Sequence, residues 1–135
     1  MIVPHPPYAL APTEFRFPAL ASLAGRSPLG GQRETAIATY VAARLAHDTL
    51  PDRGLADPVR VERVTGAKTW LANLALPAPV RPALVRLVEA TATNQSQTAE
   101  ALRAVIAVTA NLLDTKAKLE LDQLVAALSQ HDPQR

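Results

Sequence analysis

Apolar residues recur at helical spacing throughout the last third of the sequence. Twelve mostly apolar positions span 40 residues in 11 steps, about 3.6 residues per step, which is the period of a straight α-helix and not of a sustained coiled coil. This spacing predicts one long α-helix from about Asn94 to Ser129. The positions of this apolar stripe are Val88, Ala92, Gln95, Ala99, Leu102, Ile106, Thr109, Leu113, Ala117, Leu121, Leu124 and Leu128.

The apolar face of this expected helix is too wide for a lone surface helix. A second apolar row runs beside the stripe and comprises Ala101, Val105, Val108, Leu112 and Leu119. About 35 residues at roughly 1.5 Å each would also form a rod of about 50 Å, whereas a compact chain of this length has a diameter of roughly 37 Å. We therefore expect the helix to be covered by another subunit, to lie in an elongated bundle, or to break.

Self-association is the explanation that the width and length of this helix favour. The leading hypothesis is a small non-enzymatic α-helical interaction or assembly protein, whose partner is a second copy or another helical protein. The far end of the helix and its second apolar row are the parts expected to remain uncovered within one chain. The residues predicted at the interface are Leu102, Val105, Ile106, Leu112, Leu113, Leu121 and Leu124.

The overall composition favours helices and excludes several kinds of site. The 135 residues include 26 alanines and 19 leucines but only three isoleucines, a mixture typical of helical proteins. The absence of cysteine excludes disulfides and thiolate metal sites. No apolar stretch approaches the ~18 residues of a membrane span, and the N-terminus lacks the pattern of a secretory signal. We therefore expect an all-α cytoplasmic protein with no membrane partner.

Proline and glycine mark the limits of three further helices. Asp57 followed by Pro58 is a strong start signal, because aspartate accepts hydrogen bonds from free helix N–H groups and proline suits the first helical position. Gly66 lies inside the helix that follows and indicates a kink or a close contact. Helices are predicted over about 32–49, 57–76 and 79–92.

Residues 79–129 form either one helix or two, since Asn94 and Gln97 have the spacing of a capping box. In either case the expected fold is an all-α helical bundle of about four helices, with a long C-terminal helix and an extended Pro-rich N-terminal arm. The expected parts of the chain are an arm over residues 1–31, a bundle domain over 32–129 and a frayed tail over 130–135.

The N-terminal arm combines proline with aromatic residues. Residues 1–31 hold six of the twelve prolines and three of the five aromatic residues. Proline at this density prevents a long helix, although a short helical turn fits the residues from Pro18 to Ala24. Because solvated low-complexity tails rarely carry aromatic residues, Phe15 and Phe17 are predicted to anchor the arm to a surface.

Basic residues are concentrated in the middle of the chain. Residues 53–86 carry six basic and two acidic side chains, a net charge of +4, whereas residues 87–135 carry four basic and six acidic ones, a net charge of −2. A basic segment of this kind attracts anionic partners. The alternative hypothesis is a nucleic-acid-binding helical module that uses Arg60, Arg63, Lys68, Arg81 and Arg86, with Trp70 among them.

One polar cluster has the composition of a catalytic site. Arg44 lies four residues from Tyr40 and Asp48 and three from His47, so these side chains meet on one edge of a helix. In a small enzyme, His47 would act as a general base oriented by Asp48, with Arg44 binding an anion. A helix-end histidine beside a surface ion pair explains the same residues and is the preferred interpretation.

No motif in the sequence predicts a metal site or a cofactor. His5 and His131 lie near the two ends of the chain, and no predicted helix carries the Glu-x-x-His pair of di-iron bundles. Phosphate loops, dinucleotide-binding glycine motifs and the G-x-S-x-G nucleophile motif are also missing. We therefore expect no catalytic residue, no metal ligand and no cofactor.

Overall fold

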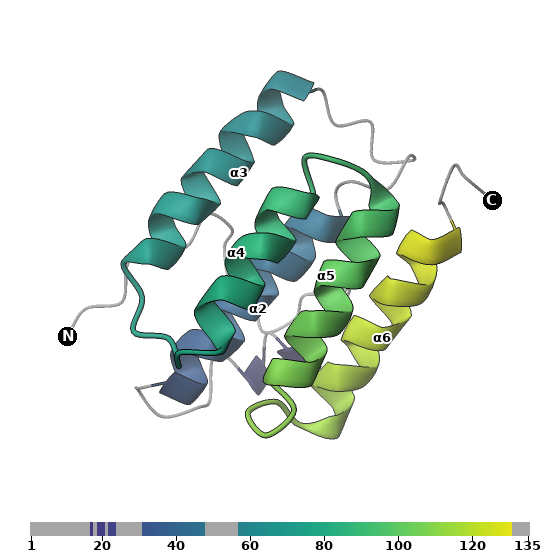
Figure 1. The fold of residues 1–135 in the computed structure, drawn as a ribbon. Helices are drawn as coiled ribbons and strands as arrows, with labels where there is room; N and C mark the ends of the chain where they lie inside the picture. The colour runs from purple at the N-terminus through teal and green to yellow at the C-terminus, as the bar shows by residue number, and fades with distance from the viewer. Residues whose placement is uncertain (1–16, 18, 21, 24–30, 48–56, 131–135) are drawn as a thin grey trace.

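The part of the chain that the structure describes is all-α, with five helices and no strand (Figure 1). The structure, a computed structural model, describes residues 17, 19–20, 22–23, 31–47 and 57–130. Most of the predicted arm, all but the first residue of the predicted tail, and Phe15 therefore lie outside the described residues. The helices are α2 (Gly31–His47), α3 (Asp57–Ala72), α4 (Val80–Ala90), α5 (Gln95–Val108) and α6 (Thr115–Gln130).

The helices form two layers. α4, α5 and α6 lie side by side, and each runs antiparallel to the next because short turns join them (Figure 1). α2 lies behind this layer and contacts α3, α4, α5 and α6. Among the described helices, α3 packs against α2 and α4, at the edge of the bundle away from α6.

The central helix of this bundle is α2, not the C-terminal helix. Every side chain from Glu34 to Ala43 is buried, on all sides of the helix. Five of the buried residues of α2 are alanines, whose small side chains let the surrounding helices approach closely. The ionisable side chains at the two ends of α2 also suit the direction of the helix dipole, with acidic Glu34 in the first turn and basic Arg44 and His47 in the last.

The expected long C-terminal helix was a wrong prediction, because residues 79–129 fold into three helices. α5 ends at Thr109, whose backbone leaves the helical region at φ −104° and ψ 9° and whose hydroxyl donates to the carbonyl oxygen of Val105 at 2.7 Å. α6 starts after Asp114, whose Oδ1 accepts a hydrogen bond from the N–H of Ala117 at 2.9 Å. The bond from Asp114 satisfies a backbone N–H at the start of α6 that has no partner within the helix. The bundle thus has five described helices instead of about four.

The predicted cap at Asn94 is confirmed, and the chain turns back there. Asn94 Oδ1 accepts from the N–H of Gln97 at 2.8 Å, as in the first half of a capping box. The second half is replaced, because Gln97 Oε1 lies 2.8 Å from the hydroxyl of Thr93. Thr98 adds a further link across the turn, since its hydroxyl lies 3.0 Å from the carbonyl oxygen of Ala90.

Two charged side chains hold the connection between α3 and α4. The Arg81 guanidinium donates to the carbonyl oxygens of Leu71, at 2.5 Å, and Leu74. The buried carboxylate of Glu34 accepts from the N–H of Ala75. These bonds close the C-terminal end of α3, which stops at Ala72 and not near residue 76.

Gly66 causes neither of the features that the sequence suggested. α3 continues without interruption from Asp57 to Ala72. A Cβ atom built on Gly66 would also meet no other atom within 4 Å. The prediction of a kink or a close contact within the chain is therefore wrong, and Gly66 faces open space on α3.

Candidate interaction site

The residues predicted at an interface lie mainly in the core of the single chain. Leu102, Val105 and Leu121 are fully buried, and Leu113 and Leu124 are nearly so. Ile106 and Leu112 are half-buried and pack against the same core. The turn between α4 and α5 and the turn between α5 and α6 fold the apolar stripe against α2 and against itself. These residues therefore do not need a second subunit to cover them.

One leucine of the second apolar row remains exposed. Along this row the burial falls from Val105, which is fully buried, through Val108 and Leu112, which are half-buried, to Leu119, which is 55% exposed. Among the described residues, the only other large hydrophobic side chain that is exposed is Val61 on α3, at 57%. The sequence predicts that the second apolar row remains uncovered, but only Leu119 on α6 is exposed.

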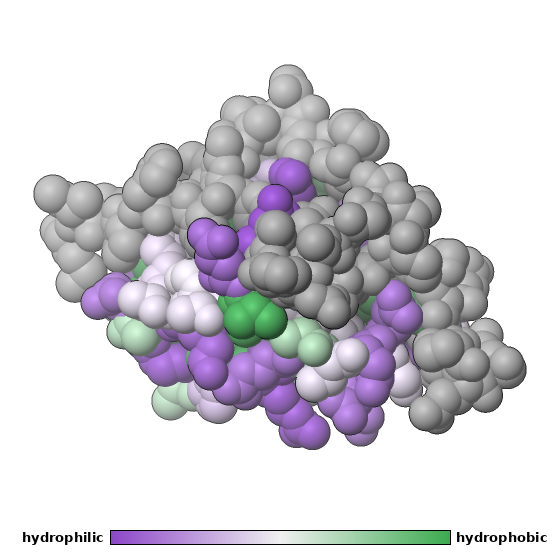
Figure 2. Space-filling view, turned by 90° about the horizontal axis from the view of Figure 1, so that it is seen from above, coloured by the Kyte–Doolittle hydropathy of each residue, from purple (hydrophilic) through white to green (hydrophobic). Residues whose placement is uncertain are grey.

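Exposed apolar surface is otherwise scattered. On the face of the molecule shown in Figure 2, the visible described residues are mainly hydrophilic, and the hydrophobic ones form small, separate areas. Single exposed apolar residues are normal on a soluble protein, so exposure alone does not identify an interface. The surroundings of Leu119 therefore decide whether it belongs to a site.

Five described residues of the N-terminal segment, some of which contact α6, are called the anchor residues: Phe17, Ala19, Leu20, Ser22 and Leu23. Phe17, Leu20 and Leu23 are buried, with exposed fractions of 3%, 0% and 5%. Ala19, Leu20, Ser22 and Leu23 are helical, within the range where a short turn was predicted. Three buried side chains at a spacing of three residues form one apolar face that packs into the bundle.

Phe17 packs edge-on against two side chains of α2. Its ring centroid lies 6.5 Å from that of Tyr40 and 6.1 Å from that of His47, with interplanar angles of 84° and 87°. Edge-to-face pairs of this kind are favourable beyond the area that they bury. Phe17 thus anchors the N-terminal segment on its own chain.

The carboxylate of Glu120 on α6 binds the backbone of the anchor residues. Its two oxygens accept from the N–H groups of Ala19, at 2.7 Å, and Leu20, at 2.9 Å. These N–H groups lie at the start of a helical turn, where they have no partner within the turn itself. Hydrogen bonds to an ionised acceptor are stronger than neutral ones, so Glu120 is a strong polar link between the described residues of the N-terminal segment and the bundle.

A hollow of about 560 Å³, which we call the α6 hollow, lies between the anchor residues and α6. Ala19 and Ser22 line one side of it, and the exposed Leu119 lines the other. It is lined by Ala19, Ser22, Asp114, Lys116, Leu119, Glu120 and Gln123.

In the cluster considered as a catalytic site, Tyr40 belongs to the core, and Arg44 and His47 are half-buried. Tyr40 is fully buried, and its hydroxyl accepts from Nη1 of Arg44 at 3.0 Å. The Arg44 guanidinium also lies 5.9 Å from the centre of the Tyr40 ring. Phe17 covers Tyr40 and His47, and these residues line neither hollow described here. This geometry gives Tyr40, Arg44 and His47 a packing role, while Asp48 lies outside the described residues.

The basic residues of the nucleic-acid hypothesis whose side chains the structure describes do not gather on one surface. Lys68 forms an ion pair with Glu89 at 2.8 Å. Arg81 is used to close the end of α3. Arg63 is exposed on α3, about 140° around the helix from Lys68. Trp70 is buried, with 6% of its surface exposed, and the side chain of Arg60 lies outside the described part.

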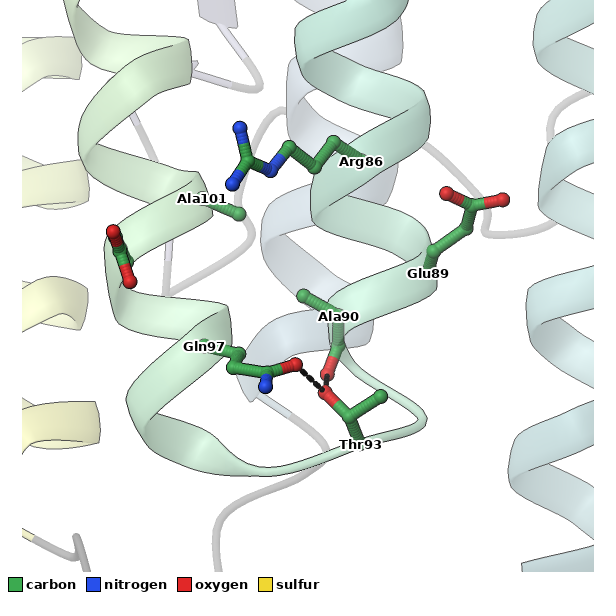
Figure 3. A pocket seen from close by; sticks show the side chains of 7 residues that line it. Arg86, Glu89, Ala90, Thr93, Gln97 and Ala101 are labelled. Carbon is green, nitrogen blue, oxygen red and sulfur yellow. Dashed lines mark hydrogen bonds between the residues drawn. The ribbon is translucent and has the colours of Figure 1, made fainter.

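Arg86 lies in a second hollow, of about 370 Å³, between α4 and α5 (Figure 3). In Figure 3 its guanidinium points toward α5, whereas Glu89 points away from the hollow. Thr93 and Gln97 close one end through the 2.8 Å contact described above. The pair of Glu89 with Lys68 joins α4 to α3, and the bond of Thr93 to Gln97 lies at the turn between α4 and α5.

Comparisons with known proteins assign no relative to this chain. No protein-family model, no curated protein and no solved structure matches it. None of the described helices is long and apolar enough to cross a membrane. Within the same described residues, no group of three or more His, Cys, Asp or Glu side chains is placed to hold a metal ion.

Sequence reasoning missed Glu120 as a residue of the candidate site. Its signal was weak, because Glu120 stands between two leucines but also among the charged residues Lys118 and Asp122. A carboxylate at the edge of an apolar face needs a bonding partner there. Its partners lie 100 and 101 residues away in the sequence, so local spacing could not name them.

Proposed function

We propose that the protein is a small non-enzymatic α-helical interaction protein that self-associates through the outer face of α6 around Leu119. The observation that carries this proposal is the exposure of Leu119 at the edge of the α6 hollow. A cytoplasmic location, expected from the sequence, belongs to the same proposal. The interface is smaller than the row predicted from sequence, because the rest of that row serves the core of one chain.

The chemistry of this face suits a second copy of the chain. Exposed residues one helical turn before and after Leu119 are Thr115 and Gln123, which carry no charge. Lys116 and Asp122 flank them with opposite charges, so the face has no net charge to repel its own copy. In a two-fold symmetric pair each copy uses the same surface, so two leucines are buried for each interface formed.

Leu119→Lys tests this proposal, with Val61→Lys as its matched control. Val61 is as exposed as Leu119 but lies on α3. Burying a leucine contributes roughly 1.5–3 kcal/mol, so losing one from each copy weakens the dimer by about 100-fold or more. Light scattering on a concentration series should give a mass above the 14.4 kDa of one chain for the wild type. Leu119→Lys should return that mass to one chain, and Val61→Lys should not.

Two results would contradict the proposal. The first is a wild-type mass of one chain at every concentration measured. The second is an equal loss of association in both variants, because a general effect of added charge would then explain it. Circular dichroism of both variants shows whether the helices are retained, which is expected because neither side chain belongs to the core.

A further inference from the structure

We infer that a small zwitterion, a molecule with one carboxylate and one ammonium group such as an amino acid, binds in the hollow between α4 and α5. We call it the α4–α5 hollow; Arg86 lines it from α4, and Gln97 and Glu100 line it from α5. Arg86 and Glu100 bring opposite charges to one hollow from two different helices. Self-association through α6 is not required, since the described lining residues belong to α4, α5 and the turn between them.

Arg86 provides a free guanidinium at this hollow. In Figure 3 the group points from α4 toward α5. None of the described residues forms an ion pair or a hydrogen bond with the side chain of Arg86. A guanidinium presents its N–H donors in a planar fork that matches the two oxygens of a carboxylate. The carboxylate of a ligand in the α4–α5 hollow therefore has a matching partner in Arg86.

Glu100 supplies the opposite charge from the other wall. Its side chain is exposed on α5, lines the same hollow and has no ionic partner in the part of the chain that the structure describes. Arg86 and Glu100 also form no ion pair with each other, so a gap remains between the two charges. A molecule that carries both a carboxylate and an ammonium group fills this gap and pairs with both side chains.

The remaining polar side chains leave these two charges to the ligand. Glu89 is paired with Lys68 at 2.8 Å and points away from the hollow (Figure 3). The hydroxyl of Thr93 lies 2.8 Å from Oε1 of Gln97 and holds that amide in place. Because Oε1 is already bonded, Gln97 has its Nε2 left as a second donor for the carboxylate of the ligand.

The floor of the α4–α5 hollow suits a short carbon skeleton. Ala90 and Ala101 line the hollow with small, buried side chains, and Figure 3 shows their methyl groups between α4 and α5. The volume of about 370 Å³ lies at the small end of the range of about 300–1,000 Å³ that is usual for ligand pockets. The hollow therefore has room for a small molecule.

The balance of charge favours a zwitterion over an anion. With Glu89 paired to Lys68, the hollow offers one positive group, Arg86, and one negative group, Glu100. A phosphate would be attracted by Arg86 but repelled by Glu100, because like charges brought together in a binding site oppose binding. A zwitterion meets an opposite charge at each end, so an amino acid is the class of ligand that fits both groups.

An NMR titration of the isotope-labelled full chain tests this site. Glycine, β-alanine and γ-aminobutyrate carry both charges at increasing separation, whereas acetate and methylamine carry one charge each. The backbone amide signals of Thr93 and Gln97 report on the hollow, because both residues line it. A second charged hydrogen bond strengthens binding by about tenfold or more. At least one of the three zwitterions should therefore bind about tenfold more tightly than acetate and methylamine.

Matched variants locate the binding. Arg86→Gln and Glu100→Gln each remove one charge and keep a polar side chain, so each should weaken binding of the preferred zwitterion by about tenfold. Arg103→Gln and Glu62→Gln make the same substitutions at exposed residues that do not line the α4–α5 hollow. These two controls should leave the dissociation constant unchanged.

Three results would overturn the proposed ligand. The first is that acetate or methylamine binds as tightly as every zwitterion, because one charge of the hollow would then suffice. The second is that no probe shifts the amide signals of Thr93 and Gln97 in a concentration-dependent way. The third is an equal loss of affinity in the control variants. Each of these results leaves the proposed self-association in place, since the mass of the assembly is measured without any probe.

Discussion

At the scale of single residues, Glu120 binds the backbone of the anchor residues to α6. Without its carboxylate, the N–H groups of Ala19 and Leu20 lose the acceptors that they have in the described part of the chain. Leaving such groups unpaired costs about 1–3 kcal/mol. We therefore expect Glu120→Ala to lower the free energy of unfolding by that amount, measured by urea denaturation, and to speed hydrogen exchange at the two amides.

Two further variants make this prediction specific. Glu120→Gln keeps an acceptor oxygen but loses the charge, so its effect should lie between that of the wild type and that of alanine. Glu100→Ala removes an exposed glutamate of α5 and should change the free energy of unfolding by less than about 0.5 kcal/mol. Equal effects of the alanine variants at 100 and 120 would contradict the role given to Glu120.

At the scale of helices, the sequence predicted burial better than it predicted boundaries. Leu102, Leu113 and Leu121 were placed on one face, and all three are buried although two different helices and a turn carry them. The apolar stripe continues at the same spacing across the turn between α5 and α6, so the spacing alone could not reveal this turn. Asp114 carried the signal for the break, but its spacing to Lys118 also fitted an ion pair within one helix.

Other features depend on contacts that no local pattern contains. The end of α3 is set by Arg81, which belongs to the next helix. The central place of α2 follows from its contacts with four other helices. The candidate site likewise joins Ser22 and Gln123, about a hundred residues apart. Local propensity and spacing predict elements and their apolar faces, and tertiary packing decides the rest.

The break between α5 and α6 makes a prediction about Asp114. Its Oδ1 caps α6 through the N–H of Ala117 at 2.9 Å. Loss of an N-cap side chain costs about 0.5–2 kcal/mol, so Asp114→Ala should lower the free energy of unfolding by that amount. Asp114→Asn keeps the acceptor oxygen and should retain most of the stability. Urea denaturation of the two variants checks this, and equal losses in both would show that the charge matters and not the cap.

At the scale of the whole molecule, α2 connects the two layers of the bundle. It contacts each of the other four described helices, and its buried alanines set how closely they approach. The carboxylate of Glu34 on this helix also accepts from the N–H of Ala75, in the connection between α3 and α4. The anchor residue Phe17 also packs on α2, so the N-terminal segment and the bundle share one core.

A larger side chain in α2 should therefore disturb the molecule as a whole. Ala42 has no exposed surface, so Ala42→Leu forces neighbouring helices apart and should cost about 1–3 kcal/mol of stability. Ala104→Leu makes the same substitution on the exposed side of α5 and should change stability by less than about 0.5 kcal/mol. Urea denaturation of both variants measures the difference. If Ala42→Leu is as well tolerated as Ala104→Leu, space remains beside α2, and its place as the packed centre of the bundle is refuted.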